Sequence, residues 1–165
     1  MKDAKGPSTL AVHGGQAPDP LTGAVMPPIY ATSTYVQQSP GKHKGFEYSR
    51  SHNPTRYAWE RAVAALEGGG AGFAFASGLA AIATVLELLD SGDHVVVGID
   101  VYGGTFRLFQ AVRARSAGLR FTFADLSEHS SLDGLIGEDT RMVWIESPTN
   151  PLLKLVDVEA VAAVC

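Results

Sequence analysis

The chain has few of the features that mark secreted, membrane-bound or nucleic-acid-binding proteins. Its single cysteine among 165 residues excludes a disulfide framework within the chain and indicates a reducing compartment. No apolar run approaches the roughly 20 residues that a membrane-spanning helix needs, and no apolar segment follows the N-terminal lysines to form a signal peptide. The net charge is −4 and no long basic run is present, so nucleic acid is not expected as a partner. These absences predict a soluble, cytoplasmic protein.

What is present is the composition of an ordinary globular domain. Hydrophobic residues make up 45% of the chain and charged residues 18%, and this length can bury a normal core. His13, His43, His94 and His129 have no partners at the spacing of a metal site, so we predict no metal. Any chemistry must therefore come from other groups or from an organic cofactor.

The first third of the chain has almost no hydrophobic periodicity. Seven of the nine prolines precede Tyr57, too densely placed for long regular elements. Its aromatic and β-branched content nevertheless exceeds that of most disordered segments, with Ile29, Tyr30, Tyr35, Val36, Phe46 and Tyr48. We therefore predict that residues 1–56 form an arm that contacts a neighbouring subunit, with a disordered segment as the alternative.

From Tyr57 onward, helical and strand patterns alternate. Asn53-Pro54-Thr55 marks the start of a helix and Gly68-Gly69-Gly70 its end. The patterns predict helices over 57–66, 79–89, 105–114, 131–136 and from about 157, with strands over 73–76, 94–99, 121–123 and 142–146. This alternation predicts an α/β fold with a mostly parallel, doubly wound sheet, and residues 57–165 would form part of one such domain.

Ligands of open α/β sheets bind at the carboxyl ends of the strands. The strand predicted over 73–76 turns through Ser77-Gly78 into a helix, and the free N–H groups of a helix start bind phosphate. Tyr102-Gly103-Gly104 follows the next strand, where a ring beside glycines can lie flat on a planar ligand. A polar loop, Glu146–Pro151, follows the strand over 142–146. These strand ends favour a planar ligand that carries phosphate; ordinary turns are the alternative.

Tyr48 and Arg50 form a second candidate anion site. At positions i and i+2 of an extended segment, the hydroxyl and the guanidinium point the same way and can bind one phosphate. Because they lie in the predicted arm, that phosphate can belong to a neighbouring subunit, whereas a solvated basic turn is the alternative. Arg56 is predicted to close the arm or to pair with Glu60 one helical turn later.

Two common nucleotide sites are disfavoured. No Gly-x-Gly-x-x-Gly follows the first predicted strand, and the chain has no Walker lysine. The ordered segments instead resemble the Cys/Met-metabolism family of pyridoxal 5'-phosphate (PLP) enzymes of fold type I. That family includes the cystathionine γ-lyases, γ-synthases and β-lyases and the methionine γ-lyases. The resemblance runs nearly end to end and rests on residues 9–15, 27–29, 45–50 with 53–56, 75–81, 101–105 and 146–151.

The resemblance implies how the chain would bind the cofactor. The backbone amides of Gly78 and Leu79 would bind the phosphate of PLP, and Tyr48 and Arg50 would contact the phosphate of the adjacent subunit's cofactor. The chain departs from many relatives at Leu79, where they have Met, and at His52, where they have Gly.

Three further residues receive roles from the resemblance. Tyr102 would stack on the pyridine ring and assist proton transfer, and Asn150 would lie near the phenolic oxygen of the ring. Arg107 is a candidate for the distal carboxylate of a substrate such as cystathionine, with an exposed helix arginine as the alternative.

The residues that complete such a site are not in the chain. The Ser-x-Thr-Lys that supplies the cofactor-bonded lysine is absent, as are the Asp for the pyridine nitrogen and the Arg for the substrate α-carboxylate. The resemblance places all three beyond Cys165. We therefore expect an N-terminal part of a longer enzyme, which holds part of the cofactor site and is not catalytic alone.

The function implied by the resemblance is that of a cystathionine γ-lyase, which converts cystathionine to cysteine, ammonia and 2-oxobutanoate. Cystathionine γ-synthase and methionine γ-lyase are the alternatives within the family, and a truncated, non-catalytic binding or assembly module is the alternative outside it. The implied assembly is a homotetramer, a dimer of dimers with active sites shared between subunits. It would bind a small amino-acid substrate and neither nucleic acid nor membrane.

Overall fold

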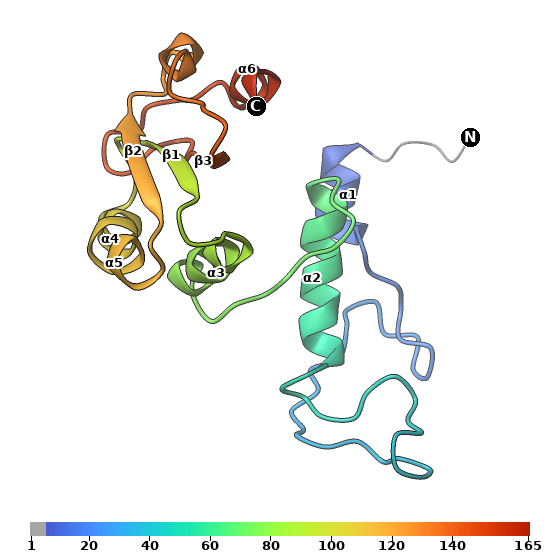
Figure 1. Cartoon of the computed structure of the whole chain (residues 1–165). Helices are drawn as coiled ribbons and strands as arrows, with labels where there is room; N and C mark the ends of the chain where they lie inside the picture. Colours follow the sequence, from blue (N-terminus) through green and yellow to red (C-terminus); the bar gives the residue numbers. More distant parts are fainter. Residues whose placement is uncertain (1–5) are drawn as a thin grey trace. The chain divides into compact units, whose positions relative to one another are not determined.

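The computed structural model describes residues 6–165, apart from the side chain of His129 (Figure 1). Residues 1–5 lie outside this range. They belong to the predicted arm and to the N-terminal segment for which no signal peptide was predicted. The chain divides into two compact units, one that ends at Phe75 and one that comprises Ala76–Cys165. No helix of the described part combines the length and the apolar character needed to cross a bilayer.

The first unit is built on two helices, α1 (Pro7–His13) and α2 (Pro54–Leu66), which pack together. Residues 14–53 between them form turns and isolated bridges, as the dense prolines predicted; α1 was not predicted. The predicted start signal of α2 is confirmed, because the Asn53 side chain accepts hydrogen bonds from the N–H groups of Thr55 and Arg56. Pro54 occupies the first turn, so the helix begins three residues earlier than expected.

The second unit contains a parallel sheet of three strands, β1 (His94–Gly98), β2 (Arg120–Ala124) and β3 (Thr140–Trp144). Their order is β2-β1-β3, with β1 in the centre. Val95, Val96 and Val97 are fully buried, as their continuous apolar run predicted.

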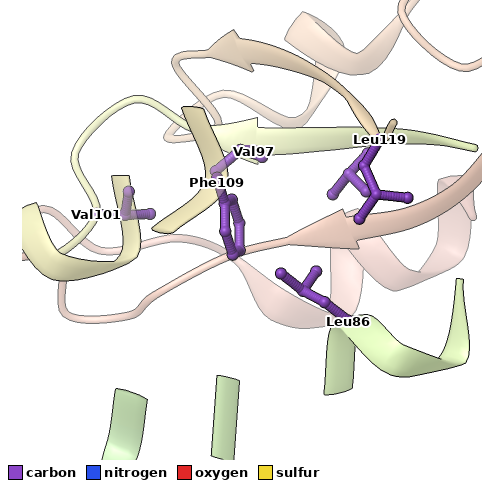
Figure 2. Close-up of a cluster of buried hydrophobic side chains, with 6 residues drawn as sticks. Leu86, Val97, Val101, Phe109 and Leu119 are labelled. Atoms are coloured by element: carbon purple, nitrogen blue, oxygen red, sulfur yellow. The ribbon is translucent and has the colours of Figure 1, made fainter. Parts of the chain in front are cut away.

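Successive valines of β1 supply two different cores. Val97 packs with Phe109 on one face of the sheet (Figure 2), in a cluster that also includes Val95. Val96 packs with Leu132 and Val161 on the other face. Because side chains alternate along a strand, both faces of the sheet are covered. The predicted doubly wound α/β fold is confirmed.

The helices of this unit vary in geometry. α3 (Gly78–Val85) continues into a 3₁₀ turn, and the helix predicted over 105–114 consists of α4 (Gly103–Arg107), a π-helical stretch (Leu108–Arg113) and α5 (Ala114–Ser116). The last helix, α6 (Val158–Val164), is capped by Asp157, whose side chain accepts a hydrogen bond from the Ala160 N–H (2.9 Å).

Two predicted elements are wrong. Residues 73–76 do not form a strand, and Phe73 and Phe75 are 79% and 43% exposed. An apolar run becomes a strand only when another backbone pairs with it, and no residue of 6–165 pairs with this one. The helix predicted over 131–136 is a short 3₁₀ turn (His129–Leu132), since Gly134 adopts a left-handed φ of 77° that stops it. β3 also ends two residues before the predicted end of its strand.

Candidate cofactor site

The N-terminus of α3 presents two free backbone donors. The Ser77 side chain accepts a hydrogen bond from the Ala80 N–H (3.1 Å), and the Ser77 backbone carbonyl accepts one from the Ala81 N–H. The N–H groups of Gly78 and Leu79 donate to no acceptor within residues 6–165, and both residues are exposed. Free N–H groups at the positive end of a helix attract anions, so this turn fits a phosphate.

The backbone of Gly78 is open to its surroundings. A Cβ atom built at Gly78 would meet no atom within 4 Å, so packing within the chain does not require glycine there. Its φ also lies outside the left-handed region. The space beside this backbone is open, and glycine leaves it free for a bound group.

Tyr102 is held at the start of α4 by a residue from the neighbouring strand end. Its N–H donates to Oε2 of Glu146 (2.9 Å), and the buried Thr105 hydroxyl donates to Oε1 (3.0 Å). A Cβ at Gly104 would lie 2.3 Å from Cε1 of Tyr102, so the ring lies directly over the glycine backbone. The ring is 49% exposed and leaves a face available to a planar ligand.

Asn150 lies in a loop that is tied to the end of β1. The side chain of Asp100 accepts hydrogen bonds from the Thr149 hydroxyl and from the Leu152 N–H (3.1 Å). Thr149 also accepts from the Lys154 N–H (2.8 Å) and is buried. The residues on both sides of Asn150 are therefore fixed.

An ion pair at the end of β2 supports the same loop. Lys154 Nζ lies 2.7 Å from Oδ2 of Asp125. The hydrogen bond from Lys154, together with those from Ser127, holds the pKa of Asp125 well below its usual range. The same bond raises the pKa of Lys154. Both groups stay charged at neutral pH, so neither is suited to transfer a proton there.

Arg107 is exposed on α4 and forms no ion pair with any described residue. Its guanidinium is thus available to a carboxylate, which fits both the predicted substrate-binding role and the alternative of an exposed helix arginine. α3, which carries Gly78 and Leu79, contacts α4, which directly follows Tyr102 and ends at Arg107.

Tyr48 and Arg50 lie together in the first unit. The guanidinium carbon of Arg50 lies 4.9 Å from the centre of the Tyr48 ring, so the two side chains are on the same side of the segment, as predicted.

Arg56 secures the backbone of this segment. It donates to the carbonyls of Ser49, Arg50 and Ser51 and lies 3.5 Å from Glu60, which confirms its predicted structural role. The Arg50 backbone is therefore held in place, while its side chain is exposed and can reach an anion.

Sequence reasoning assigned no role to Asp100 or Glu146. Both are acidic residues that follow strands of the sheet, at the edge where ligands of α/β sheets bind, and that position was the available signal. Their partners lie 41 to 52 residues away in sequence, so the contacts themselves could not be predicted.

The sequence profile of a family described as Cys/Met metabolism PLP-dependent enzyme matches residues 8–165. The chain belongs to this family. It is 60% identical over 156 residues to a cystathionine β-lyase of Coxiella burnetii, covering 94% of the chain and 40% of that protein. It is 51% identical to the cystathionine γ-lyase of Bos taurus, covering 94% and 38%.

The fold of this chain closely matches that of a solved structure. The crystal structure of metB from Corynebacterium glutamicum superposes with a TM-score of 0.91 at 43% identity, covering 98% of this chain and 42% of that one. The chain thus spans about 40% of the length of these relatives. The family uses PLP, and the free N–H groups at Gly78 and Leu79 fit its phosphate.

Proposed function

We propose that the protein containing this chain is a PLP-dependent enzyme that acts on a carbon–sulfur bond of an amino acid, and specifically a cystathionine γ-lyase. The observation that carries the proposal is the free, exposed pair of N–H groups at Gly78 and Leu79, in a chain of a PLP-dependent family. The name of the relative from Bos taurus supports the γ-lyase assignment.

In this proposal each site residue has one task. Bound PLP would supply an acceptor for electrons released at the substrate's Cα. Gly78 and Leu79 bind its phosphate through their N–H groups, and Tyr102 covers its ring and moves a proton with its hydroxyl. Asn150 donates a hydrogen bond to the phenolic oxygen.

The remaining residues act at the periphery of the site. Tyr48 and Arg50 bind the phosphate of a neighbouring subunit's cofactor through a hydroxyl and a guanidinium, and their side chains lie on the same side of the segment. Arg107, which is exposed and forms no ion pair with a described residue, binds the distal carboxylate of cystathionine.

A cystathionine β-lyase is the second candidate, because a relative with that name is 60% identical over this segment. The two reactions are separated by their products. The full-length protein, loaded with PLP and given cystathionine, should release cysteine and 2-oxobutanoate if it is a γ-lyase. Homocysteine and pyruvate would instead identify a β-lyase.

A γ-synthase and a methionine γ-lyase are distinguished by their own substrates. Formation of cystathionine from an O-acylhomoserine and cysteine would identify a γ-synthase, and release of methanethiol from methionine a methionine γ-lyase. A protein that stays colourless after PLP is added, and turns over none of these substrates, would be a non-catalytic binding or assembly module.

The proposed assembly is a cytoplasmic homotetramer in which residues 1–56 reach a neighbouring subunit. Light scattering on the full-length protein measures its mass. Mixed oligomers of an Arg50→Ala subunit and a Gly78→Pro subunit test the shared site. Within each mixed dimer of the tetramer, one of the two sites would hold both intact residues and regain PLP binding. Mixed oligomers that regain nothing would contradict the crossing arm.

A further inference from the structure

The carboxylate that follows each of the strands β1 and β3 binds the loop that follows the other strand. Asp100 follows β1 and binds the loop after β3, through the Thr149 hydroxyl and the Leu152 N–H. Glu146 follows β3 and binds the turn after β1, through the Tyr102 N–H and the Thr105 hydroxyl. β1 and β3 are paired neighbours, so each strand end carries the group that fixes the other's loop.

Each of these carboxylates binds the hydroxyl group of a buried threonine. Thr105, at 0% exposure, and Thr149, at 7%, are the two buried polar side chains among the described residues. Each donates its hydroxyl proton to one of the two carboxylates. A buried hydroxyl without a partner is costly, so both contacts are specified by the fold.

Glu146 also binds the residue that precedes α4. Tyr102 is the residue before the first turn of α4, and its own side chain makes no capping bond. The Glu146 carboxylate accepts the N–H of Tyr102 and lies at the positive end of the helix. The backbone from which the Tyr102 ring projects is therefore set by a residue of the other strand.

We propose that Asp100 and Glu146 are positioning residues, which together form a reciprocal clamp that sets Tyr102 and Asn150 against the cofactor ring. The inference rests on the proposed function, because it gives those two residues a ring to contact. Glu146 acts through Tyr102, and Asp100 acts through the loop that carries Asn150. Both donors to Asp100 use the single oxygen Oδ2, so the amide oxygen of Asn can replace it. The two donors to Glu146 use different oxygens, so the one amide oxygen of Gln can replace the acceptor of the Tyr102 N–H but not both acceptors.

The test uses the full-length protein with PLP and four variants, Glu146→Ala, Glu146→Gln, Asp100→Ala and Asp100→Asn. Asp139→Ala is the matched control, because Asp139 forms an ion pair with Arg120 in the same unit but precedes β3 and lies at the opposite edge. The readouts are the dissociation constant of PLP, the visible absorption maximum of the bound cofactor and its change with pH.

Each alanine variant should weaken PLP binding about tenfold or more, the effect of losing one to two net hydrogen bonds, and should shift the absorption maximum. The Asp100→Asn variant should restore both readouts to near the wild-type values, and the Glu146→Gln variant, which keeps one of two acceptors, should restore them in part. The double alanine variant should lose less than the product of the two single losses, because the groups act as one network.

The outcomes separate the two proposals. Wild-type protein that binds no PLP overturns the proposed function. Wild-type protein that binds PLP, with alanine variants that match Asp139→Ala in affinity and spectrum, overturns the clamp alone. If an alanine variant does not fold, Thr105→Val and Thr149→Val remove only the buried hydroxyls, and unchanged spectra in both would overturn the clamp equally.

Discussion

The two units of the chain are held together in different ways. In the second unit apolar side chains fill both sides of a sheet, and Val95, Val96, Val97 and Phe109 are fully buried. In the first unit Ala58 is the one buried apolar side chain of the described residues, while Leu21 and Val36 are 91% and 93% exposed.

Polar contacts take the place of a core in the first unit. Asn53 caps α2 and donates to the Tyr30 carbonyl (3.1 Å), and Arg56 binds three successive carbonyls. Net hydrogen bonds contribute far less per residue than apolar burial does. The second unit therefore carries the stability described here, while the first presents side chains such as Arg50.

The largest expected effect tests that contrast directly. Phe109→Ala should lower the free energy of unfolding by about 3–5 kcal/mol, because it leaves a cavity beside the central strand. Leu21→Ala should change it by less than about 0.5 kcal/mol, as at other exposed positions. Urea unfolding of the 165-residue chain measures both. A costly Leu21→Ala in the assembled full-length protein would show that another subunit covers this side chain.

The second prediction concerns the contribution of the first unit to cofactor binding. Arg50→Ala should weaken PLP binding by about 10- to 100-fold, the usual effect of losing hydrogen bonds to a charged group. Tyr48→Phe removes a neutral donor and should weaken it by about 3- to 10-fold. Equilibrium titration with PLP measures both. Arg115→Ala, at another exposed arginine, is the control, and an equal loss there would mean that the effect is not local.

The third prediction concerns the open space at Gly78. Gly78→Ala should leave the urea midpoint of the apoprotein nearly unchanged, because the added Cβ meets no atom. It should weaken PLP binding by about tenfold if the phosphate occupies that space. Gly70→Ala, at another glycine with open surroundings, should change neither quantity. Unaltered PLP affinity in Gly78→Ala would place the phosphate elsewhere.

The smallest expected effect is a pH dependence confined to the second unit. Burial, and secondarily the charge of Arg120, lower the pKa of His94, whose ring nitrogens lie 2.9 Å from the hydroxyls of Thr122 and Thr140. The folded state therefore binds this proton less tightly than the unfolded state does. This part of the stability is present above the unfolded pKa of about 6.5 and is lost as pH falls below it.

His94→Gln should flatten that dependence. Thermal unfolding of both proteins between pH 5 and pH 8 provides the measurement. His43→Gln, at an exposed histidine of the first unit, should leave the profile as in the wild type. A wild-type melting temperature that rises on acidification through this range would contradict the assignment.

Local signals in the sequence predicted much of the fold. The run of Val95 to Val97 predicted β1, and Asn53 predicted the start of α2 through a bond that spans only a few residues. The apolar run at Phe73 to Ala76 carried a similar signal and failed, because strand formation depends on a pairing partner rather than on composition.

In the candidate site, too, residues with a local signal could be predicted and residues that depend on distant contacts could not. Gly78, Leu79 and Tyr102 were found because each stands at a turn with an unusual local sequence. Glu146 and Asp100 were missed, because what makes them important is a contact across two strand ends. The roles of all these residues in cofactor binding remain predictions.

The strand order β2-β1-β3 has a practical consequence for anyone who produces this segment. Only β1 is paired on both sides, so no strand of residues 6–165 pairs with the outer borders of β2 and β3. Such borders recruit further strands from other molecules. Overexpressed by itself, the segment should therefore self-associate with rising concentration, and charged substitutions along those borders should keep it dispersed.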